Sequence, residues 1–150
     1  MKVGIIGAGA YALALAHVFK QNNDVIIWTK LEDEYKELKE KRTNEKVLPN
    51  FKLDSNIKIT LDLKEVTRVD LVIVAIPAKF VDSISKELKG LIKKQYVCIA
   101  TKGIERDTCL FPIDVYRKHN KTSNIAVISG PSFARDIITN SPIGLSVATK

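Results

Sequence analysis

The feature that most constrains the fold of this chain is a glycine-rich turn close to its amino terminus. Gly7, Gly9 and Ala12 follow the GxGxxG/A pattern, and the turn joins an expected strand at Lys2–Gly7 to an expected alanine-rich helix at Ala10–Gln21. The pattern alone is weak evidence, but a strand before it and a helix after it are the context in which it binds dinucleotides. The alternative is a glycine turn without a ligand.

Each position of this turn has a physical role in such a site. Gly7 permits the tight turn, Gly9 lets the backbone approach a pyrophosphate, and Ala12 keeps the helix close to the sheet. The amides of Ala10 and Tyr11 lie at the start of the helix, where free N–H groups favour an anion. We therefore expect these five residues to contact a dinucleotide cofactor.

Beyond the turn, apolar segments alternate with amphipathic ones along the whole chain. This order predicts an α/β fold of the Rossmann type, a doubly wound, mostly parallel sheet with helices on both faces. The further expected strands are Asp24–Trp28, Asn56–Thr60, Val69–Ile76, Tyr96–Ala100, Asn124–Ser129 and Ile143–Ala148. Thr29 and Glu32 have the spacing of a capping box, so a helix is expected from Thr29, its N-cap, to about Arg42. The other expected helices are a brief one at Asp62–Glu65, one from Pro77 to about Leu91, one over Leu110–His119 and a short one that starts at Pro131.

Length and composition indicate one globular domain. The chain has 150 residues, of which 45% are hydrophobic and 27% are charged, and such a chain buries a sizeable core. No apolar run approaches the roughly 18 residues of a membrane helix. Glycines at positions 4, 7 and 9 interrupt the amino-terminal apolar segment, which argues against a signal peptide. We expect no membrane association.

The net charge of +7 fits two kinds of partner, nucleic acid or a phosphorylated small molecule. The lysines alternate with acidic residues, as in KLEDEYKELKEKR, which is typical of a solvated helical face. The few aromatic residues are not interleaved with the basic ones, as a nucleic-acid surface would require. We expect a small phosphorylated ligand and no nucleic acid.

Cysteine and histidine residues give no sign of a metal site or a catalytic group. Cys98 and Cys109 lack metal-ligand spacing and do not indicate a disulfide framework, so a reducing, cytoplasmic setting is expected. Cys98 falls in an expected buried strand, and His17 and His119 have no partners at a usable spacing. Structural or surface roles are therefore expected for these residues.

The end of the second expected strand bears on cofactor preference. NAD-binding domains often carry an acid there, which binds the ribose 2′-hydroxyl, but this chain has Thr29 and Lys30. Lys30 is placed to face a 2′-phosphate, which gives a mild preference for NADP over NAD. The alternative is an ordinary surface lysine.

Two later segments also follow expected strands and so fall at the same edge of the sheet. Lys102 lies just past an expected buried strand, where an ammonium group can bind a phosphorylated or carbonyl substrate. In Ser129–Ala134, as in the first turn, a glycine after a strand allows a close approach of the backbone, and a proline starts a helix whose amides face the same crevice. By position alone, a solvent-facing lysine and a simple helix cap explain these segments equally well.

Taken together, these motifs resemble the bacterial NAD(P)-dependent glycerol-3-phosphate dehydrogenases. The resemblance covers the chain in order, through GAGAYALALA, LPNFKL, VAIPAKF, ATKGIE and ISGPSFA. ATKGIE and GPSFA are much more specific than the glycine pattern. The family interconverts dihydroxyacetone phosphate and sn-glycerol 3-phosphate by hydride transfer, and the product supplies phospholipid synthesis.

The resemblance also implies roles for individual residues. It implies cofactor contacts at Ala10, Tyr11, Lys30, Phe80, Lys102 and Ala134, and substrate contacts at Lys102, Gly130 and Ser132. Phe80 would otherwise be interpreted as a core residue. The chain departs from the family pattern at Ala10, often a serine, at Ala12, usually a third glycine, and at Val47, commonly a tyrosine.

Length is the most important departure. The family's general acid/base is a lysine in an all-helical second domain, and full-length members are homodimers. We interpret residues 1–150 as the NAD(P)-binding domain, with the catalytic helical domain absent from this chain, so no catalytic residue is assigned within it. The alternatives are a reductase of the 6-phosphogluconate or ketopantoate type and a non-catalytic dinucleotide-binding module.

Overall fold

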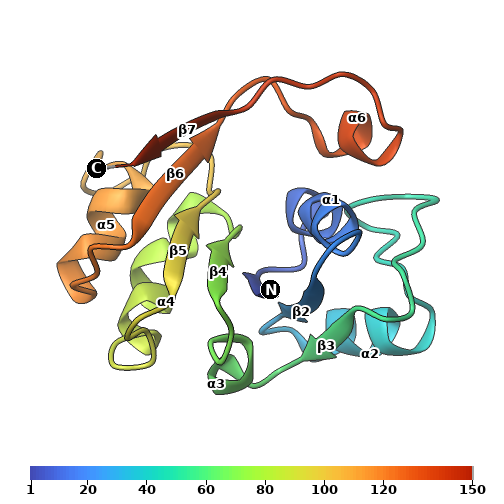
Figure 1. Cartoon of the computed structure of the whole chain (residues 1–150), viewed down its shortest axis with the longest axis horizontal. Helices are drawn as coiled ribbons and strands as arrows, with labels where there is room; N and C mark the ends of the chain where they lie inside the picture. Colours follow the sequence, from blue (N-terminus) through green and yellow to red (C-terminus); the bar gives the residue numbers. More distant parts are fainter. Residues whose placement is uncertain (150) are drawn as a thin grey trace.

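The computed structural model of the chain describes residues 1–149, and within them seven strands form one sheet in the order β3-β2-β1-β4-β5-β6-β7 (Figure 1). Neighbouring strands are parallel except for β6 and β7, which are antiparallel. The strands are β1 (Lys2–Ile6), β2 (Asp24–Trp28), β3 (Lys58–Thr60), β4 (Leu71–Val74), β5 (Tyr96–Ile99), β6 (Ile125–Ser129) and β7 (Ser146–Thr149). The expected fold class is confirmed.

Helices follow most of the strands and cover both faces of the sheet. They are α1 (Ala10–Phe19), α2 (Glu32–Glu40), α3 (Leu63–Val66), the 3₁₀ helix η1 (Ala78–Phe80), α4 (Val81–Glu87), α5 (Pro112–His119) and α6 (Ala134–Ile138). Asp62 caps α3, as expected, by accepting a hydrogen bond from the amide of Lys64 at 2.8 Å.

The core consists of two layers, one on each face of the sheet. Because successive side chains of a strand point to opposite faces, Ile5 and Ile27 belong to one layer and Ile6 and Trp28 to the other. The first layer packs against α1, which is nearly all alanine and leucine on its buried side. The second layer contains Val66 of α3 and further buried residues of α4 and α5. Because the strands of this parallel sheet are continuously apolar, both faces of the sheet have to be covered.

The strand order reverses between β1 and β4, which are neighbours in the sheet although two strands separate them in the sequence. Doubly wound sheets bind ligands outside the carboxyl ends of the strands at such a switch point. The glycine-rich turn follows β1, and Ala75 follows β4, where its amide donates to the carbonyl of Ile6 at 2.9 Å. The fold therefore places the turn at the expected ligand-binding edge.

The helix α2 differs from the sequence prediction at both of its ends. The helix expected to be capped by Thr29 begins at Glu32, and Thr29 accepts instead from the amide of Leu31 in a short turn before it. The helix ends at Glu40, and Arg42 adopts a φ of +63°, so the expected end at Arg42 is also wrong. Local hydrogen bonds of threonine compete with helix formation, and here the turn is favoured.

The helix starts predicted from proline differ from the structure in two further segments. Pro77 precedes one turn of 3₁₀ helix before α4, which ends at Glu87 rather than Leu91. Pro131 does not open a helix, because the backbone stays extended at Phe133 and α6 begins at Ala134. A proline at N1 is compatible with a helix start but does not require one.

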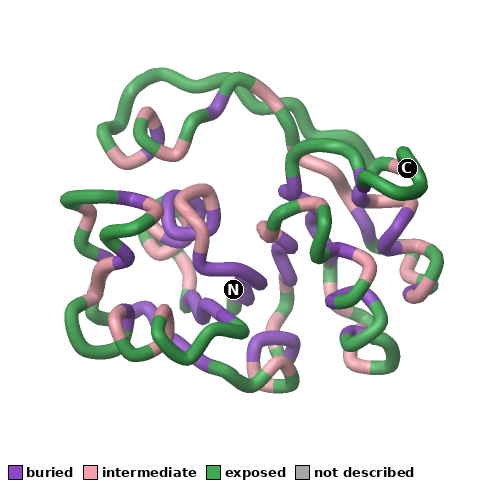
Figure 2. The backbone as a smooth tube through the Cα atoms, turned by 180° about the vertical axis from the view of Figure 1, so that it is seen from behind, coloured by how far each residue is buried: buried purple, intermediate pink, exposed green. Residues whose placement is uncertain are grey.

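The connections between β6, α6 and β7 make a long excursion from the edge of the sheet. Figure 1 shows α6 beside α1, and many residues of the two helices contact each other. Figure 2 shows continuous exposure along the return to β7, and residues 139–149 are all exposed. The final strand is Ser146–Thr149 rather than Ile143–Ala148. The excursion brings the segment after β6 over the amino end of α1.

Candidate functional site

The first turn of the site has a backbone that only glycine fits at position 7. Gly7 has a φ of +121°, and a Cβ placed there would lie 2.4 Å from the carbonyl oxygen of Ala75. The Gly7 amide donates to the carbonyl of Trp28 at 2.9 Å, which ties the turn to β2. Gly7 is therefore needed for the chain to turn between β1 and α1 in the close space beside β4.

Gly9 is different, because nothing within the fold requires a glycine there. Its φ of −71° is accessible to any residue, and a Cβ built on it would meet no atom within 4 Å. The space in front of Gly9 is therefore open, at the N-cap of α1. This is the arrangement expected where backbone must approach a ligand closely.

The start of α1 presents a group of unbonded amides. The first i to i−4 bond of this helix runs from the amide of Leu13 to the carbonyl of Gly9 at 3.0 Å. Among residues 1–149, the amides of Gly9, Ala10, Tyr11 and Ala12 have no hydrogen-bond acceptor. Free N–H groups and the positive end of the helix dipole together favour an anion such as a diphosphate. The turn thus fits the phosphate part of a dinucleotide.

A pocket of about 520 Å³ lies next to this turn. It is mostly apolar, with polar groups concentrated where β2 ends. Its walls come from the glycine-rich turn, the end of β2, the segment after β4 and the first turns of α4. The lining residues are Gly7, Ala8, Gly9, Trp28, Thr29, Lys30, Leu31, Glu34, Val47, Ala75, Ile76, Pro77, Phe80, Ser83 and Ile84. An apolar pocket with few polar groups is typical of a site for a nucleoside.

An acidic side chain enters this pocket, although no acid follows β2 directly in the sequence. Glu34, in the first turn of α2, lines the pocket and accepts a hydrogen bond from the hydroxyl of Thr29 at 2.5 Å. The sequence signal for Glu34 was weak, because the residue lies five positions beyond the expected one. A carboxylate here is placed to accept a hydrogen bond from a ribose hydroxyl, and its negative charge disfavours a nearby phosphate.

Lys30 lies at the mouth of the same pocket, as its proposed role requires. Its ammonium group is paired with Glu87 at the end of α4, with an N···O distance of 2.8 Å, and both side chains are largely exposed. A phosphate at this position would have to compete with the Glu87 carboxylate. The pairing was not visible in the sequence, because 57 residues separate the partners.

Two apolar residues of the site, Phe80 and Val47, lie in the pocket wall. Phe80, for which the resemblance implies a cofactor contact, is 47% exposed and lines the pocket instead of lying in the core. Val47 lines the pocket as well. The departure from tyrosine at position 47 therefore alters the wall of the pocket itself.

A second cluster joins three segments that are distant in the sequence. The Lys102 ammonium group donates to the carbonyl oxygen of Ser132 at 3.1 Å and lies 4.7 Å from the centre of the Tyr11 ring. The Tyr11 and Ser132 hydroxyls are 3.1 Å apart. Within residues 1–149, Lys102 forms no ion pair, so its charge is held by carbonyl oxygens and an aromatic face. Such an ammonium group is available to an anionic ligand.

The segment after β6 supplies the remaining predicted residues. Gly130 has a φ of +148°, and a Cβ there would lie 2.3 Å from the Gly144 carbonyl oxygen, which explains the glycine on structural grounds. Its own carbonyl lies 3.5 Å from the Lys102 ammonium nitrogen. Ala134 begins α6, which packs against α1. The structure therefore brings all the predicted positions to the carboxyl ends of the strands.

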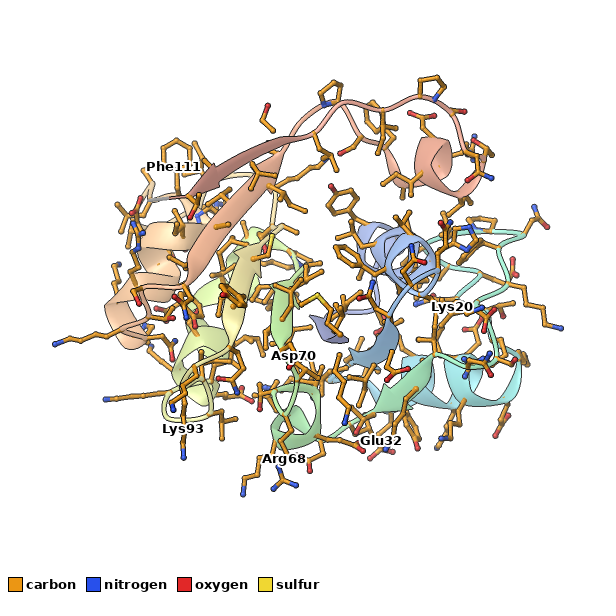
Figure 3. The ribbon with its side chains drawn as sticks, in the orientation of Figure 1. Lys20, Glu32, Arg68, Asp70, Lys93 and Phe111 are labelled. Carbon is orange, nitrogen blue, oxygen red and sulfur yellow. The ribbon has the colours of Figure 1, made fainter. Side chains whose placement is uncertain are left out.

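Two larger hollows, of about 860 and 750 Å³, lie at the opposite end of the sheet. Figure 3 shows Arg68, Asp70 and Lys93 at this end, where the strands begin. Charged surface side chains dominate their walls, and Asp70 already accepts from the amide of Lys2 at 2.7 Å. Neither hollow contains a glycine-rich turn or the first turn of a long helix. We therefore place the candidate site at the smaller pocket.

The histidine and cysteine residues lie outside the site. His119 was expected to have a structural or surface role, and its Nε2 lies 2.8 Å from Asp82, a contact that links α5 to α4. Lys86 and His119 lower the pKa of Asp82 to about 2. Cys98 is buried, and desolvation raises the pKa of its thiol to about 11, which disfavours the reactive thiolate.

Two features are absent from the part of the chain that the structure describes. Within residues 1–149, no group of three or more histidine, cysteine or acidic side chains is arranged to hold a metal ion. None of the helices formed by these residues combines the length and the hydropathy needed to cross a bilayer.

The strand order, the glycine-rich turn and the pocket at the switch point together define a Rossmann-type dinucleotide-binding fold. Comparison with known families is more specific. Residues 2–150 match the family described as "NAD-dependent glycerol-3-phosphate dehydrogenase N-terminus", and the chain belongs to this family. The resemblance inferred from ATKGIE and GPSFA is confirmed.

Individual relatives agree with this assignment. The chain is 37% identical over 142 residues to a glycerol-3-phosphate dehydrogenase [NAD(P)+] of Fusobacterium nucleatum subsp. nucleatum, covering 91% of this chain and 42% of that protein. It is 32% identical to the Roseobacter denitrificans protein of the same name, covering 99% and 46%. The crystal structure of glycerol-3-phosphate dehydrogenase from Coxiella burnetii superposes with a TM-score of 0.89 at 28% identity, covering 97% of this chain and 46% of that one. The chain thus spans less than half the length of these relatives.

Proposed function

We propose that residues 1–150 are the cofactor-binding half of an NAD(P)-dependent glycerol-3-phosphate dehydrogenase. The whole enzyme would interconvert sn-glycerol 3-phosphate and dihydroxyacetone phosphate by hydride transfer and feed phospholipid synthesis. One observation carries the proposal: four unbonded amides at the start of α1 stand beside an apolar pocket, in a chain of this family. NAD or NADP supplies the hydride carrier, and the chain's residues bind and orient it.

The proposed cofactor contacts divide by chemistry. The glycine-rich turn and the first amides of α1 bind the diphosphate, whereas Lys30 and Phe80 form the wall around the adenosine. Lys102 and Ala134 lie farther along the carboxyl edge, after β5 and at the start of α6. This distribution supports an extended dinucleotide that lies across the switch point. The proposed contacts are Gly7, Gly9, Ala10, Tyr11, Ala12, Lys30, Phe80, Lys102 and Ala134.

We propose that the phosphorylated substrate binds at Lys102, Gly130 and Ser132. The support is the cluster around the Lys102 ammonium group, which has no acidic partner among residues 1–149 and lies beside the Ser132 hydroxyl. Lys102 positions and polarises the substrate. The proton that accompanies hydride transfer requires a positioned acid. We propose that this acid is a lysine in the helical domain of the full-length enzyme, outside residues 1–150.

The proposal extends to the setting of the full-length enzyme. We propose a homodimer in the reducing environment of the cytoplasm, without nucleic-acid or membrane partners. Both cysteines are free thiols, which fits a reducing compartment.

We propose a mild preference for NADP, since Lys30 stands at the pocket mouth where an acid would favour NAD. Two carboxylates limit this preference. Glu87 neutralises Lys30, and Glu34 lies inside the pocket. Because the Lys30 contact is exposed and worth about 1 kcal/mol or less, we expect a ratio of no more than about tenfold.

The test replaces Gly9, the one turn residue whose side-chain space is open. Gly9→Val keeps an accessible φ, and its Cβ meets no protein atom within 4 Å, so we expect the fold to survive. Its side chain would occupy the space needed by the diphosphate, and NADPH binding measured by calorimetry should weaken by more than about tenfold, or roughly 1.4 kcal/mol. Gly144→Val is the matched control, since its Cβ would approach Pro131 no closer than 3.7 Å.

Parental NADPH affinity in Gly9→Val would show that the turn does not bind the cofactor. Binding by the parent without turnover in the full-length protein would instead favour a non-catalytic dinucleotide-binding module.

A further inference from the structure

Asn44 is a buried polar residue that the sequence patterns did not single out. It lies in the segment between α2 and β3, which returns beside α1 (Figure 1), and only 2% of its surface is exposed. Its side-chain amide Nδ2 donates to the carbonyl oxygen of Ala8 at 3.2 Å. Ala8 is the residue between the two glycines of the turn. A side chain from a distant segment is thus hydrogen-bonded to the backbone of the proposed diphosphate site.

We propose that Asn44 is a positioning residue that orients the Gly9 amide toward the cofactor diphosphate, an inference that rests on the proposed function. The peptide bond between Ala8 and Gly9 is planar and trans, so its carbonyl and its N–H point in opposite directions. Holding the Ala8 carbonyl on the Asn44 side therefore fixes the Gly9 N–H on the opposite side. The Gly9 amide has no acceptor among residues 1–149.

This turn needs such a restraint because glycine leaves its backbone free to rotate. Gly9 has open space where a Cβ would be, so no side-chain contact of its own holds the peptide plane. The Ala8 carbonyl is also kept out of the helix: the first bond of α1 is accepted by Gly9, not by Ala8. The Asn44 side chain is the group that bonds to it. A turn ordered before the ligand arrives loses less entropy on binding.

Asn44 also orders the pocket wall on its other side. Its backbone carbonyl accepts from the amides of Val47 at 3.2 Å and Leu48 at 3.0 Å. Val47 lines the pocket, and Leu48 is buried in the core layer below. Asn44 therefore joins the diphosphate turn and the loop that carries Val47 into one unit.

The experiment compares two substitutions of Asn44 with a control in the same loop. Asn44→Ala removes the donor, and Asn44→Asp keeps the size of the side chain while replacing the donor by an acceptor, which tests the bond if the alanine variant does not fold. Leu48→Ala lowers the stability of the fold by removing apolar volume from the core layer, without touching the bond to Ala8. Affinities for NADH by calorimetry and for adenosine by NMR titration are measured at a temperature where each variant is folded.

We expect both Asn44 variants to bind NADH roughly fivefold to tenfold more weakly than the parent, as the loss of one orienting hydrogen bond implies. Adenosine, which lacks phosphate, should bind them as it binds the parent, and Leu48→Ala should bind both ligands normally. Parental NADH affinity in the Asn44 variants, or an equal loss of adenosine binding, would overturn the inference. A parent chain that does not bind NADH at all would overturn the proposed function and this inference with it.

Discussion

The charge around Lys30 shows how far single residues of this site were predictable. The sequence identified Lys30 because it lies two residues after β2, and the structure places it in the lining of the pocket. Its partner Glu87 belongs to another helix, and Glu34 enters the pocket from the first turn of α2. These three charges come from the end of β2, from α2 and from α4, so their balance depends on the tertiary structure and cannot be predicted from a local sequence pattern.

This balance leads to a prediction about cofactor preference. Glu87→Gln frees Lys30 from its ion pair, so the ratio of NADPH to NADH affinity should rise by about twofold to fivefold, as expected for one exposed charge contact. Lys30→Ala should lower the same ratio toward one. The affinities are measured by calorimetry at low ionic strength, because salt screens exposed charges. Tighter NADH than NADPH binding by the parent would contradict the proposed preference.

Contacts between segments that are distant in the sequence became apparent only in the fold. Asn44 and Ala8 are 36 positions apart, and Tyr11 and Ser132 are 121 apart. The glycine-rich turn, by contrast, is local and was predicted residue by residue. Residues that act through the backbone of their own turn can be found from sequence, whereas residues that orient another segment cannot.

Secondary-structure elements were predictable in order and type, but their ends were not. Seven strands were expected from their apolar runs, and the six that are parallel in the structure each lie within the expected range. Helix starts at Thr29 and Pro131 were wrong, because threonine and proline are equally compatible with turns. Competition between a cap and a turn is decided by the neighbouring elements.

The contact between β1 and α3 leads to a prediction about stability. A Cβ on Gly4 would lie 2.0 Å from the carbonyl oxygen of Val66, which is backbone and cannot swing aside. Gly4→Ala should therefore lower the free energy of unfolding by roughly 3 kcal/mol, measured by urea denaturation. Gly9→Ala is the matched control and should change it by less than about 0.5 kcal/mol, since its Cβ meets nothing. Equal stability of the two variants would refute the close packing of α3 on β1.

At the scale of the whole molecule, the site extends along one edge of the sheet. The pocket beside the glycine-rich turn and the Lys102 cluster both lie at the carboxyl ends of the strands. The alternation of strands and helices was sufficient to predict this edge, because the switch point follows from the doubly wound order. The excursion that carries α6 over α1 was not predictable, since its contacts are all long-range.

The division of labour proposed here leads to a prediction about activity. Residues 1–150 should bind NADPH but should not reduce dihydroxyacetone phosphate at a useful rate, because a missing general acid typically costs about 10²–10⁴-fold. Losing the second wall of the site adds further cost, because the substrate is no longer oriented. A spectrophotometric assay of NADPH oxidation compares this chain with a full-length relative. Comparable turnover by the two would contradict the division.

The most direct test of the central claim is an NMR titration of the ¹⁵N-labelled chain, whose mass of 16.7 kDa suits the method, with NADPH. The claim is that the dinucleotide binds at the carboxyl edge, beside the free amides of α1, rather than in the larger hollows at the amino edge. The account predicts saturable shifts that are largest at the amides of residues 9–12 and at Lys30. Shifts centred on Asp70 and Lys93, or no saturable shifts, would contradict it.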